Sequence, residues 1–217
     1  MFNQVQAIVR ITETKDIQTT QTGTSILKFR AEACQQYIDK TGEQKQSMTG
    51  YNFVIWGKRA ETMKTYLVEG QHVFLTGSIS YSTYEDRETG EERRYTDIRV
   101  DDLKLLGETA TESLYLDITL LGRLGVDPTR RKGFTSFTVI TEEHYTSNGE
   151  KKTKTTSHSC TAWDHLADPA MNMLSKGQTV QIKAKVRFNK HNDVYYTDLS
   201  VFHFNALAKS RKQAAAA

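Results

Sequence analysis

The sequence predicts a mainly β protein made of two tandem domains, and three observations lead to this prediction. A segment is written twice: residues 53–81 recur as residues 160–188, and 107 residues separate matching positions such as Trp56 and Trp163. Short runs alternate between apolar and polar residues and are rich in β-branched and aromatic side chains, as strands are. The length of 217 residues suits two domains of about 100 residues, each large enough to bury a core.

The first repeat contains five runs with the period of two that is typical of a strand. They are residues 5–11, 25–34, 51–56, 72–85 and 93–106. Between the third and fourth run, residues 58–70 show apolar side chains on one helical face and end at a glycine, which predicts a helix.

The second repeat has the same organisation. Its five expected strands are residues 114–124, 134–145, 157–163, 179–188 and 194–204, and its expected helix covers residues 165–177. Three strands, a helix and two further strands are the element order of an OB-fold, a five-stranded Greek-key barrel with one helix between strands 3 and 4. The predicted fold class is therefore all-β (mainly), with two tandem OB-folds.

The domain limits follow from the repeat and from composition. We expect the first OB-fold over residues 1–108, a short polar linker over 109–113, the second OB-fold over 114–206, and a flexible, basic, alanine-rich tail over 207–217. The hairpin between strands 4 and 5 is six residues shorter in the second repeat, so the two domains are not interchangeable.

The composition narrows the classes of partner. Residues 1–108 carry a net charge of −2 and residues 109–217 a net charge of +5, which is compatible with a polyanionic partner. No apolar run reaches the roughly 20 residues of a membrane span, and no charged leader precedes an apolar block, so we expect a cytoplasmic protein without a membrane partner. The two cysteines, Cys34 and Cys160, occupy non-equivalent positions and are interpreted as reduced packing residues.

Motifs for catalysis or cofactor binding are absent from the sequence. The six histidines show no metal-ligand spacing, and His158 is interpreted as a strand-packing or interface residue. The glycines of residues 122–125 lack the Lys-Ser/Thr of a phosphate-binding loop. We therefore expect no enzyme activity, no metal and no cofactor.

The third strand of each repeat carries the main candidate for binding. Alternation places Phe53 and Ile55 toward the core, and Val54 and Trp56 on the outer face. Trp163 occupies the equivalent outer position. Aromatic rings on an open OB sheet stack against the bases of single-stranded nucleic acid with little sequence preference. The stacking candidates are Tyr37, Trp56, Tyr81, Tyr84, Tyr95, Tyr145, Trp163, Phe188 and Tyr195.

Basic residues near these rings are candidates for contacts with the phosphate backbone. They are Lys28, Arg30, Lys58, Arg59, Arg93, Arg94, Arg130, Arg131, Lys132, Lys151, Lys152, Lys154, Lys185, Arg187 and Lys190. Alternative interpretations stay open at this point: either tryptophan can be an interface or packing residue, the tyrosines can be cross-strand pairs, and the lysines of residues 151–154 can be solvated loop charges.

Four segments resemble the bacterial single-stranded DNA-binding protein family. ITLLGRLGVDP (118–128) is similar to its opening strand, WGKRAETMKTYLVEGQHVFLTG (56–77) to the end of its strand 3, its helix and its strand 4, and RRYTDIRV (93–100) and YYTDLSV (195–201) to its strand 5. The resemblance implies an OB-fold that binds single-stranded DNA in replication, recombination and repair. It also implies that the strand 2 stacking site falls on Tyr37 and Tyr145, the strand 3 site on Trp56 and Trp163, and the hairpin site on Tyr84, with only His191 at that register in the second repeat.

The chain also departs from the family pattern. A family aromatic six residues before the strand 3 ring is replaced by Gly50 and Ser157, which suggests an altered affinity or a shifted DNA path. The end of the chain is unlike the family's acidic tip, so recruitment of other proteins through such a tip is not expected. Because the family usually assembles four OB domains, a two-domain chain is expected to form a homodimer, in the bacterial nucleoid or in a host cytoplasm if it is phage-encoded.

Two rival functions remain compatible with the sequence. One is an OB-fold assembly factor, in which one domain binds a protein partner in place of DNA. The other is an RNA-binding OB protein, since stacking does not exclude ribose.

Overall fold

The structure is a computed structural model of the whole chain. It describes residues 1–38, 41–85, 90, 92–107, 114–147, 149–191 and 194–207. The chain divides into two compact units. The N-terminal unit consists of Gln4–Ser82 with Thr96–Leu116, and the C-terminal unit consists of Met1–Asn3, Thr83–Tyr95 and Asp117–Ala217.

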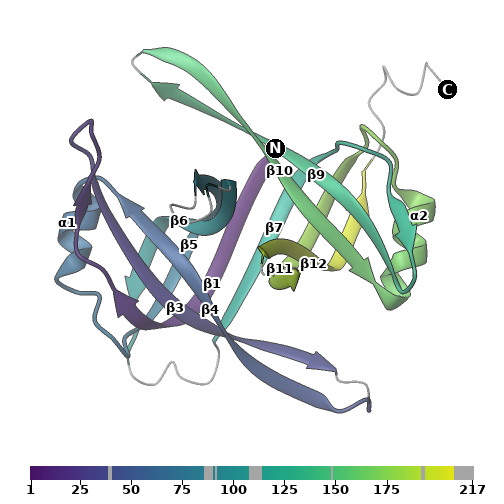
Figure 1. Ribbon diagram of the computed structural model, residues 1–217, viewed down its shortest axis with the longest axis horizontal. Coiled ribbons are helices and arrows are strands. Elements are labelled where there is room, and N and C mark those ends of the chain that lie inside the picture. Colours follow the sequence, from purple (N-terminus) through teal and green to yellow (C-terminus); the bar gives the residue numbers. More distant parts are fainter. Residues whose placement is uncertain are drawn as a thin grey trace. The chain divides into compact units, whose positions relative to one another are not determined.

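The first OB-fold is a barrel whose strands meet in the order β2-β3-β4-β6-β5-β1, with β1 also pairing with β3 to close it (Figure 1). β4 and β6 are parallel, with Phe53 opposite Ile98. The elements are β1 (Phe2–Thr14), β2 (Gln18–Thr19), β3 (Ser25–Ile38), β4 (Gln44–Trp56), α1 (Lys58–Lys64), β5 (His72–Glu85) and β6 (Glu92–Leu105).

The second OB-fold repeats this topology in the order β7-β11-β12-β10-β9-β8, closed by β7 with β9. Its elements are β7 (Tyr115–Leu124), β8 (Thr129–Arg131), β9 (Phe134–Ser147), β10 (Glu150–Trp163), the 3₁₀ turn η2 (Asp164–Leu166), α2 (Ala167–Met173), β11 (Thr179–His191) and β12 (Val194–Ala206). The prediction of two OB-folds is confirmed. The short strands β2 and β8, which pair with β3 and β9, were not predicted.

Each barrel is filled from one face of its strands. In the first OB-fold the rings of Phe29 and Phe53 stack with centroids 5.1 Å apart, and alternate residues along β1 are buried. In the second, Ile118, Leu120, Ile182 and Leu199 are fully buried. Burying such apolar surface is the main favourable term in folding. Val54, which alternation assigns to the outer face, is nevertheless only 5% exposed, beside the parallel strand β6.

Both helices are shorter than predicted: α1 ends at Lys64 and α2 ends at Met173, although the sequence favoured helices as far as Gly70 and Gly177. The reason lies in the first strand of each barrel. Gly70 N donates to Ile11 O at 2.9 Å, and Gly177 N donates to Leu124 O at 2.7 Å. The glycines bond to a strand and do not cap the helices. Among the described residues, no helix has the length and apolar character needed to cross a membrane.

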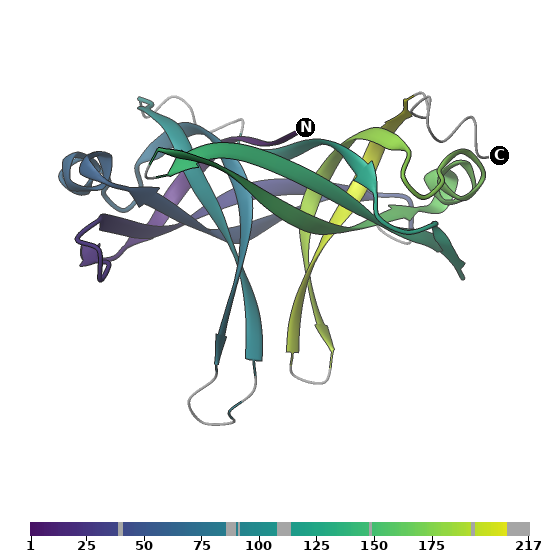
Figure 2. The ribbon, with the colours of Figure 1, turned by 90° about the horizontal axis from the view of Figure 1, so that it is seen from above.

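Two hairpins are longer than predicted. β3 and β4 pair as far as Ile38 opposite Gln44, and β9 and β10 as far as Ser147 opposite Glu150, so each forms an arm that extends beyond its own barrel (Figure 1). In a second view, the β5–β6 and β11–β12 hairpins also extend beyond their barrels (Figure 2). The β3–β4 and β9–β10 arms lack apolar alternation because both of their faces are exposed over much of their length.

Candidate nucleic-acid interface

Trp56 is an open aromatic surface at the end of β4. Its side chain is 46% exposed, whereas Phe53 and Ile55 on the opposite face are buried. Its cross-strand neighbour is Ile26 on β3, a half-buried aliphatic residue. The exposed indole leaves its π-face open for a base to stack on. Trp56 therefore occupies the outer-face position that the sequence predicts for it.

The two basic residues that follow Trp56 differ in their surroundings. The Arg59 guanidinium donates to the backbone oxygen of Asp101, and its Nη2 lies 3.1 Å from Asp102 Oδ1. Lys58 is exposed, and its ammonium has no hydrogen bond or ion pair within the described part of the chain. Lys58 is thus the more readily available cation beside the open indole.

Trp163, at the equivalent position of β10, is covered on its surface by neighbouring side chains. The Phe134 ring lies 4.9 Å from the indole at an interplanar angle of 38°, and the Arg187 Cζ lies 4.8 Å from the ring centroid. The Trp163 Nε1 is buried without a hydrogen-bond partner among the described residues. A guanidinium over an indole is a cation–π contact, so this ring already has a ligand within its own domain.

A buried carboxylate lies directly across from Arg187 on the neighbouring strand. Asp198 on β12 is directly opposite Arg187 on β11, and it accepts a hydrogen bond from Ser159 Oγ at 3.0 Å. Burial raises the pKa of Asp198, an effect that hydrogen bonds from Thr161 and Ser159 and the charge of Arg187 partly offset. The carboxylate attracts the Arg187 guanidinium to the sheet surface.

Asp97 is the equivalent aspartate of the first OB-fold. Burial again raises its pKa, and the nearby charge of Lys28 lowers it in part. Two residues predicted to contact a DNA backbone, Lys28 and Arg187, thus each lie in the field of a partly desolvated aspartate on the sheet.

Arg30 lies over Gly50, a position where the sequence resemblance implies an aromatic residue. A Cβ added at Gly50 would lie 2.8 Å from the Arg30 Nε, so the guanidinium covers the glycine backbone. Arg30 is opposite Asn52 on β4 and is exposed to solvent. A planar cation therefore takes the place of a ring on this part of the outer face.

Strand alternation sorts the hairpin aromatics into two groups. Tyr95 shares the face of Asp97, whereas Tyr81 and Phe188 share the faces of the buried Ile79 and Val186. Tyr81 is half-buried and Phe188 is exposed.

Tyr196 is a further exposed aromatic residue that is not among the stacking candidates named from the sequence. It is 52% exposed on the same face as Asp198, and it is the counterpart of Tyr95. The sequence contained the signal, because 101 residues separate Tyr95 from Tyr196 as they separate Asp97 from Asp198.

The other predicted cations of the second OB-fold lie in separate places. Arg130 is occupied by an ion pair with Asp168 at 2.9 Å and by backbone oxygens, whereas Arg131 and Lys132 are exposed. Lys185 lies on the Arg187 face of β11.

Lys151, Lys152 and Lys154 belong to strand β10 of the arm, although a loop was expected there, and Lys152 lies 4.0 Å from Glu150. Tyr145 is exposed on the paired strand β9 of the same arm, directly opposite Lys152. The side chains of Tyr37, Tyr84, Arg93, Arg94, Lys190, His191 and Tyr195 lie outside the described part of the structure.

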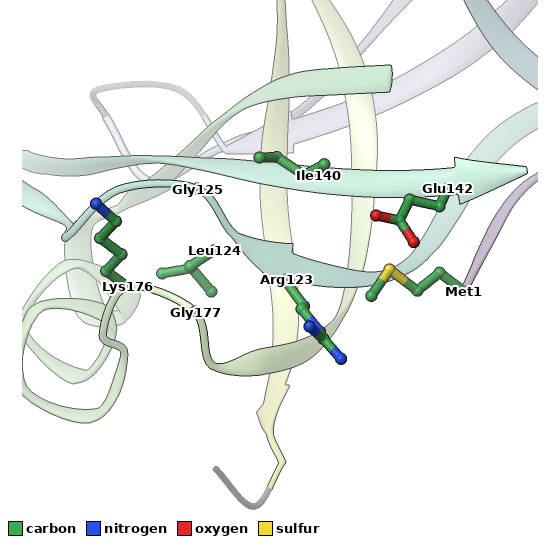
Figure 3. A pocket seen from close by; sticks show the side chains of 8 residues that line it. All are labelled: Met1, Arg123, Leu124, Gly125, Ile140, Glu142, Lys176 and Gly177. Atoms are coloured by element: carbon green, nitrogen blue, oxygen red, sulfur yellow. The ribbon is translucent and has the colours of Figure 1, made fainter. Parts of the chain in front are cut away.

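A separate pocket of about 460 Å³ lies in the C-terminal unit (Figure 3). Its lining consists of Met1, Arg123, Leu124, Gly125, Ile140, Glu142, Lys176 and Gly177. Six residues of β9 separate Phe134 from Ile140, about 20 Å of extended chain. The pocket is therefore distinct from the cluster around Trp163.

Two other side chains with titratable groups, His158 and Cys160, are buried and belong to the packed interior. His158 is fully buried, with its Nε2 2.9 Å from Thr141 Oγ1. Burial raises the pKa of the Cys160 thiol well above its ordinary value, with a further contribution from the charge of Asp198. Among the residues that the structure describes, no three His, Cys, Asp or Glu side chains gather as metal ligands.

Tryptophans, tyrosines and cations lie on the outer faces of both OB-folds. This combination is typical of the class of OB-folds that bind single-stranded nucleic acid. The model of the Single-strand binding protein family matches residues 2–106 and again residues 116–202. The chain belongs to this family and carries its domain twice.

The curated relatives match about half of this chain. The single-stranded DNA-binding protein of Borreliella burgdorferi is 32% identical over 96 residues, which cover 44% of this chain and 64% of that protein. Single-stranded DNA-binding protein 1 of Chlorobaculum tepidum is 26% identical over 106 residues, covering 49% and 65%. The chain thus spans slightly less than two thirds of the length of either relative.

The fold is similar to that of a solved two-domain structure over nearly the whole chain. The wild-type single-stranded DNA binding protein of Thermus aquaticus is 21% identical, with a TM-score of 0.73 over 96% of this chain and 94% of that chain. A deletion variant of the same protein gives a TM-score of 0.75 at 20% identity and 96% coverage of both chains.

Proposed function

We propose that this protein binds single-stranded DNA without sequence preference and protects it during replication, recombination and repair. The observation that carries the proposal is the open indole of Trp56, on the non-core face of an OB-fold in a chain of the single-strand binding family. An aromatic ring in this position offers a π-face that any base can stack on. Catalysis has no part in the proposed activity.

The proposed mechanism combines stacking with neutralisation of the DNA backbone. Bases stack on Trp56 and on Tyr95 of the same outer face in the first OB-fold, and Lys58 and Arg30 balance the phosphates. In the second OB-fold, Lys185, Arg131 and the lysines of the β10 arm supply charge. Each neutralised phosphate releases counterions, so the affinity should fall steadily as salt rises.

Intrinsic fluorescence during titration with oligo(dT) tests the proposal, because the chain has only two tryptophans. We expect strong quenching by the single strand, weakened by salt and absent with a duplex of matched length. In a Trp56→Phe variant most of this quenching should disappear. Failure of oligo(dT) to bind at low salt would contradict the proposal and favour an assembly factor. Tighter binding of a matched RNA oligomer would instead indicate an RNA-binding protein.

We also propose that two chains associate to present four OB-folds, in the bacterial cytoplasm where single-stranded DNA is exposed. The support is that the chain carries the family's domain twice. The sequence resemblance implies four such domains per assembly, which two chains would supply. Light scattering at working concentration tests this proposal, and a mass of one chain would contradict it.

A further inference from the structure

The two stacking positions have different neighbours at matching places in the repeat. Trp56 and Trp163 are equivalent, and so are Ser80 and Arg187, with 107 residues between the members of each pair. The strand pairs place Ile26 beside Trp56 and Phe134 beside Trp163. The second OB-fold thus has an arginine and a second ring where the first has a serine and an aliphatic side chain.

We propose that Arg187 is an intramolecular cap on Trp163, which occupies the ring surface that a base would use. The second OB-fold then takes a base on Trp163 only after the guanidinium has moved, whereas Trp56 in the first is free from the start. This inference rests on the proposed binding of single-stranded DNA. It assigns the initial contact to the first OB-fold and makes the second a weaker, regulated site.

The contacts around Trp163 support a cap. The Arg187 Cζ is 4.8 Å from the indole centroid, within the range of a cation–π interaction. Arginine suits this role because its guanidinium is planar and weakly hydrated. Phe134 holds the ring from another direction at 4.9 Å, and the buried Trp163 Nε1 has no partner among the described residues that would orient it otherwise.

Asp198 adds an attractive charge near the cap. It lies opposite Arg187 on the neighbouring strand, and the Ser159 hydroxyl fixes its carboxylate. The ionised carboxylate offsets part of the Arg187 charge, so Arg187 should attract a phosphate less strongly than an isolated lysine does. On this argument Arg187 opposes binding at Trp163, although its charge alone suggests a backbone contact.

The experiment uses the full chain in a Trp56→Phe background, where Trp163 is the one remaining tryptophan and its emission can be excited selectively. Phenylalanine keeps an aromatic ring at position 56 and removes its signal. Arg187→Ser then copies the serine of the first OB-fold. We expect Trp163 to become more accessible to acrylamide, and oligo(dT) to quench it at about two- to fivefold lower concentration, the size of a cation–π contact at a partly exposed site.

The salt dependence separates the cap from a phosphate contact. Loss of a phosphate contact lowers the slope of log affinity against log salt by about 0.7 for a single strand. Loss of the cap should leave this slope unchanged. Weaker quenching together with a smaller slope would overturn the proposal, and so would unchanged quenching.

Two further variants serve as controls. One keeps the positive charge at position 187, and the other adds an arginine to the first OB-fold and leaves the second OB-fold's Arg187 in place. Arg187→Lys keeps a cation that can still lie over the ring but loses the planar guanidinium, so it should strengthen quenching by less than Arg187→Ser does; a larger increase than that of Arg187→Ser would count against the cap. Ser80→Arg in a Trp163→Phe background places the cap on Trp56 and should weaken quenching about two- to fivefold despite the added charge. Unchanged or stronger quenching by Ser80→Arg would also contradict the cap.

The outcomes distinguish this inference from the proposed function. If the unsubstituted protein does not bind oligo(dT), the proposed function fails and the acrylamide measurement alone tests the cap. If it binds and the position 187 and position 80 variants do not change in the stated directions, only the cap is wrong.

Discussion

The outer faces of the two OB-folds present the same tryptophan in opposite states. Trp56 is nearly half exposed beside an aliphatic neighbour, whereas Trp163 lies between a phenylalanine and an arginine with its ring nitrogen buried. The backbone positions are equivalent, so the difference comes from two side chains, Phe134 and Arg187. The two copies of the fold therefore keep the same aromatic residue at the same place, but neighbouring side chains cover it in only one of them.

The largest expected effect is on DNA affinity when each indole is removed in turn. Trp56→Ala should cost about 1–3 kcal/mol of binding, the range for loss of one base stack, because this ring is free. Trp163→Ala should cost clearly less, because the ring is already occupied by Arg187. Filter binding or anisotropy with labelled oligo(dT), measured at one fixed salt concentration, gives both values. An equal loss from both variants would mean that the two faces bind alike.

The sequence predicts the framework of this comparison well. The constant spacing between repeats places both tryptophans at the ends of β4 and β10, with Phe53 and Ile55 in one core and Cys160 and Ala162 in the other. These positions follow from alternation, which burial of one sheet face enforces.

The sequence does not predict the contacts that distinguish the two faces. Arg187 reaches Trp163 from β11, and β12 separates the two strands, so no local pattern connects these residues. The arms of β3–β4 and β9–β10 were also missed, because hairpins exposed on both faces have no apolar period to detect. Glycines that predict a helix end bond instead to a strand that lies far away in the sequence.

The second prediction concerns stability. For the free energy of unfolding, loss of Trp163 should have the larger effect and loss of Trp56 the smaller, which is the reverse of their order for DNA affinity. Trp163→Ala removes contacts with Phe134 and Arg187 and should lower the free energy of unfolding by about 2 kcal/mol, less than for a fully buried ring. Trp56→Ala should change it by about 0.5 kcal/mol or less, as exposed positions do. Urea unfolding followed by circular dichroism measures both.

Trp163→Phe is the matched control for this prediction. It keeps a ring against Phe134 and removes the buried, unpaired Nε1, so its loss should be much smaller than that of Trp163→Ala. If Trp56→Ala were the more destabilising substitution, the exposed ring would have a structural role and the contrast between the faces would be wrong.

The smallest expected effect is the pH dependence contributed by Asp198, which faces the Arg187 cap. Burial raises the pKa of Asp198 above 3.8, so the folded protein holds this proton more tightly than the unfolded chain does. The stability that the carboxyl contributes is fully present below pH 3.8 and is lost as the pH rises through the raised pKa. Asp198→Asn has no such titration. Its unfolding free energy relative to the parent should therefore increase as the pH rises from acid toward neutral.

Asp97→Asn is the matched variant in the first OB-fold. Asp97 is equivalent to Asp198, but the first OB-fold has Ser80 in place of Arg187. Burial raises its pKa too, but it is half-buried where Asp198 is buried, so its pH-dependent difference should have the same sign and a smaller size. Urea midpoints of both variants and the parent across this pH range give the two differences. A difference that does not vary with pH for Asp198→Asn would mean that this carboxylate is as well solvated in the folded protein as in the unfolded chain. Water would then screen its charge from Arg187.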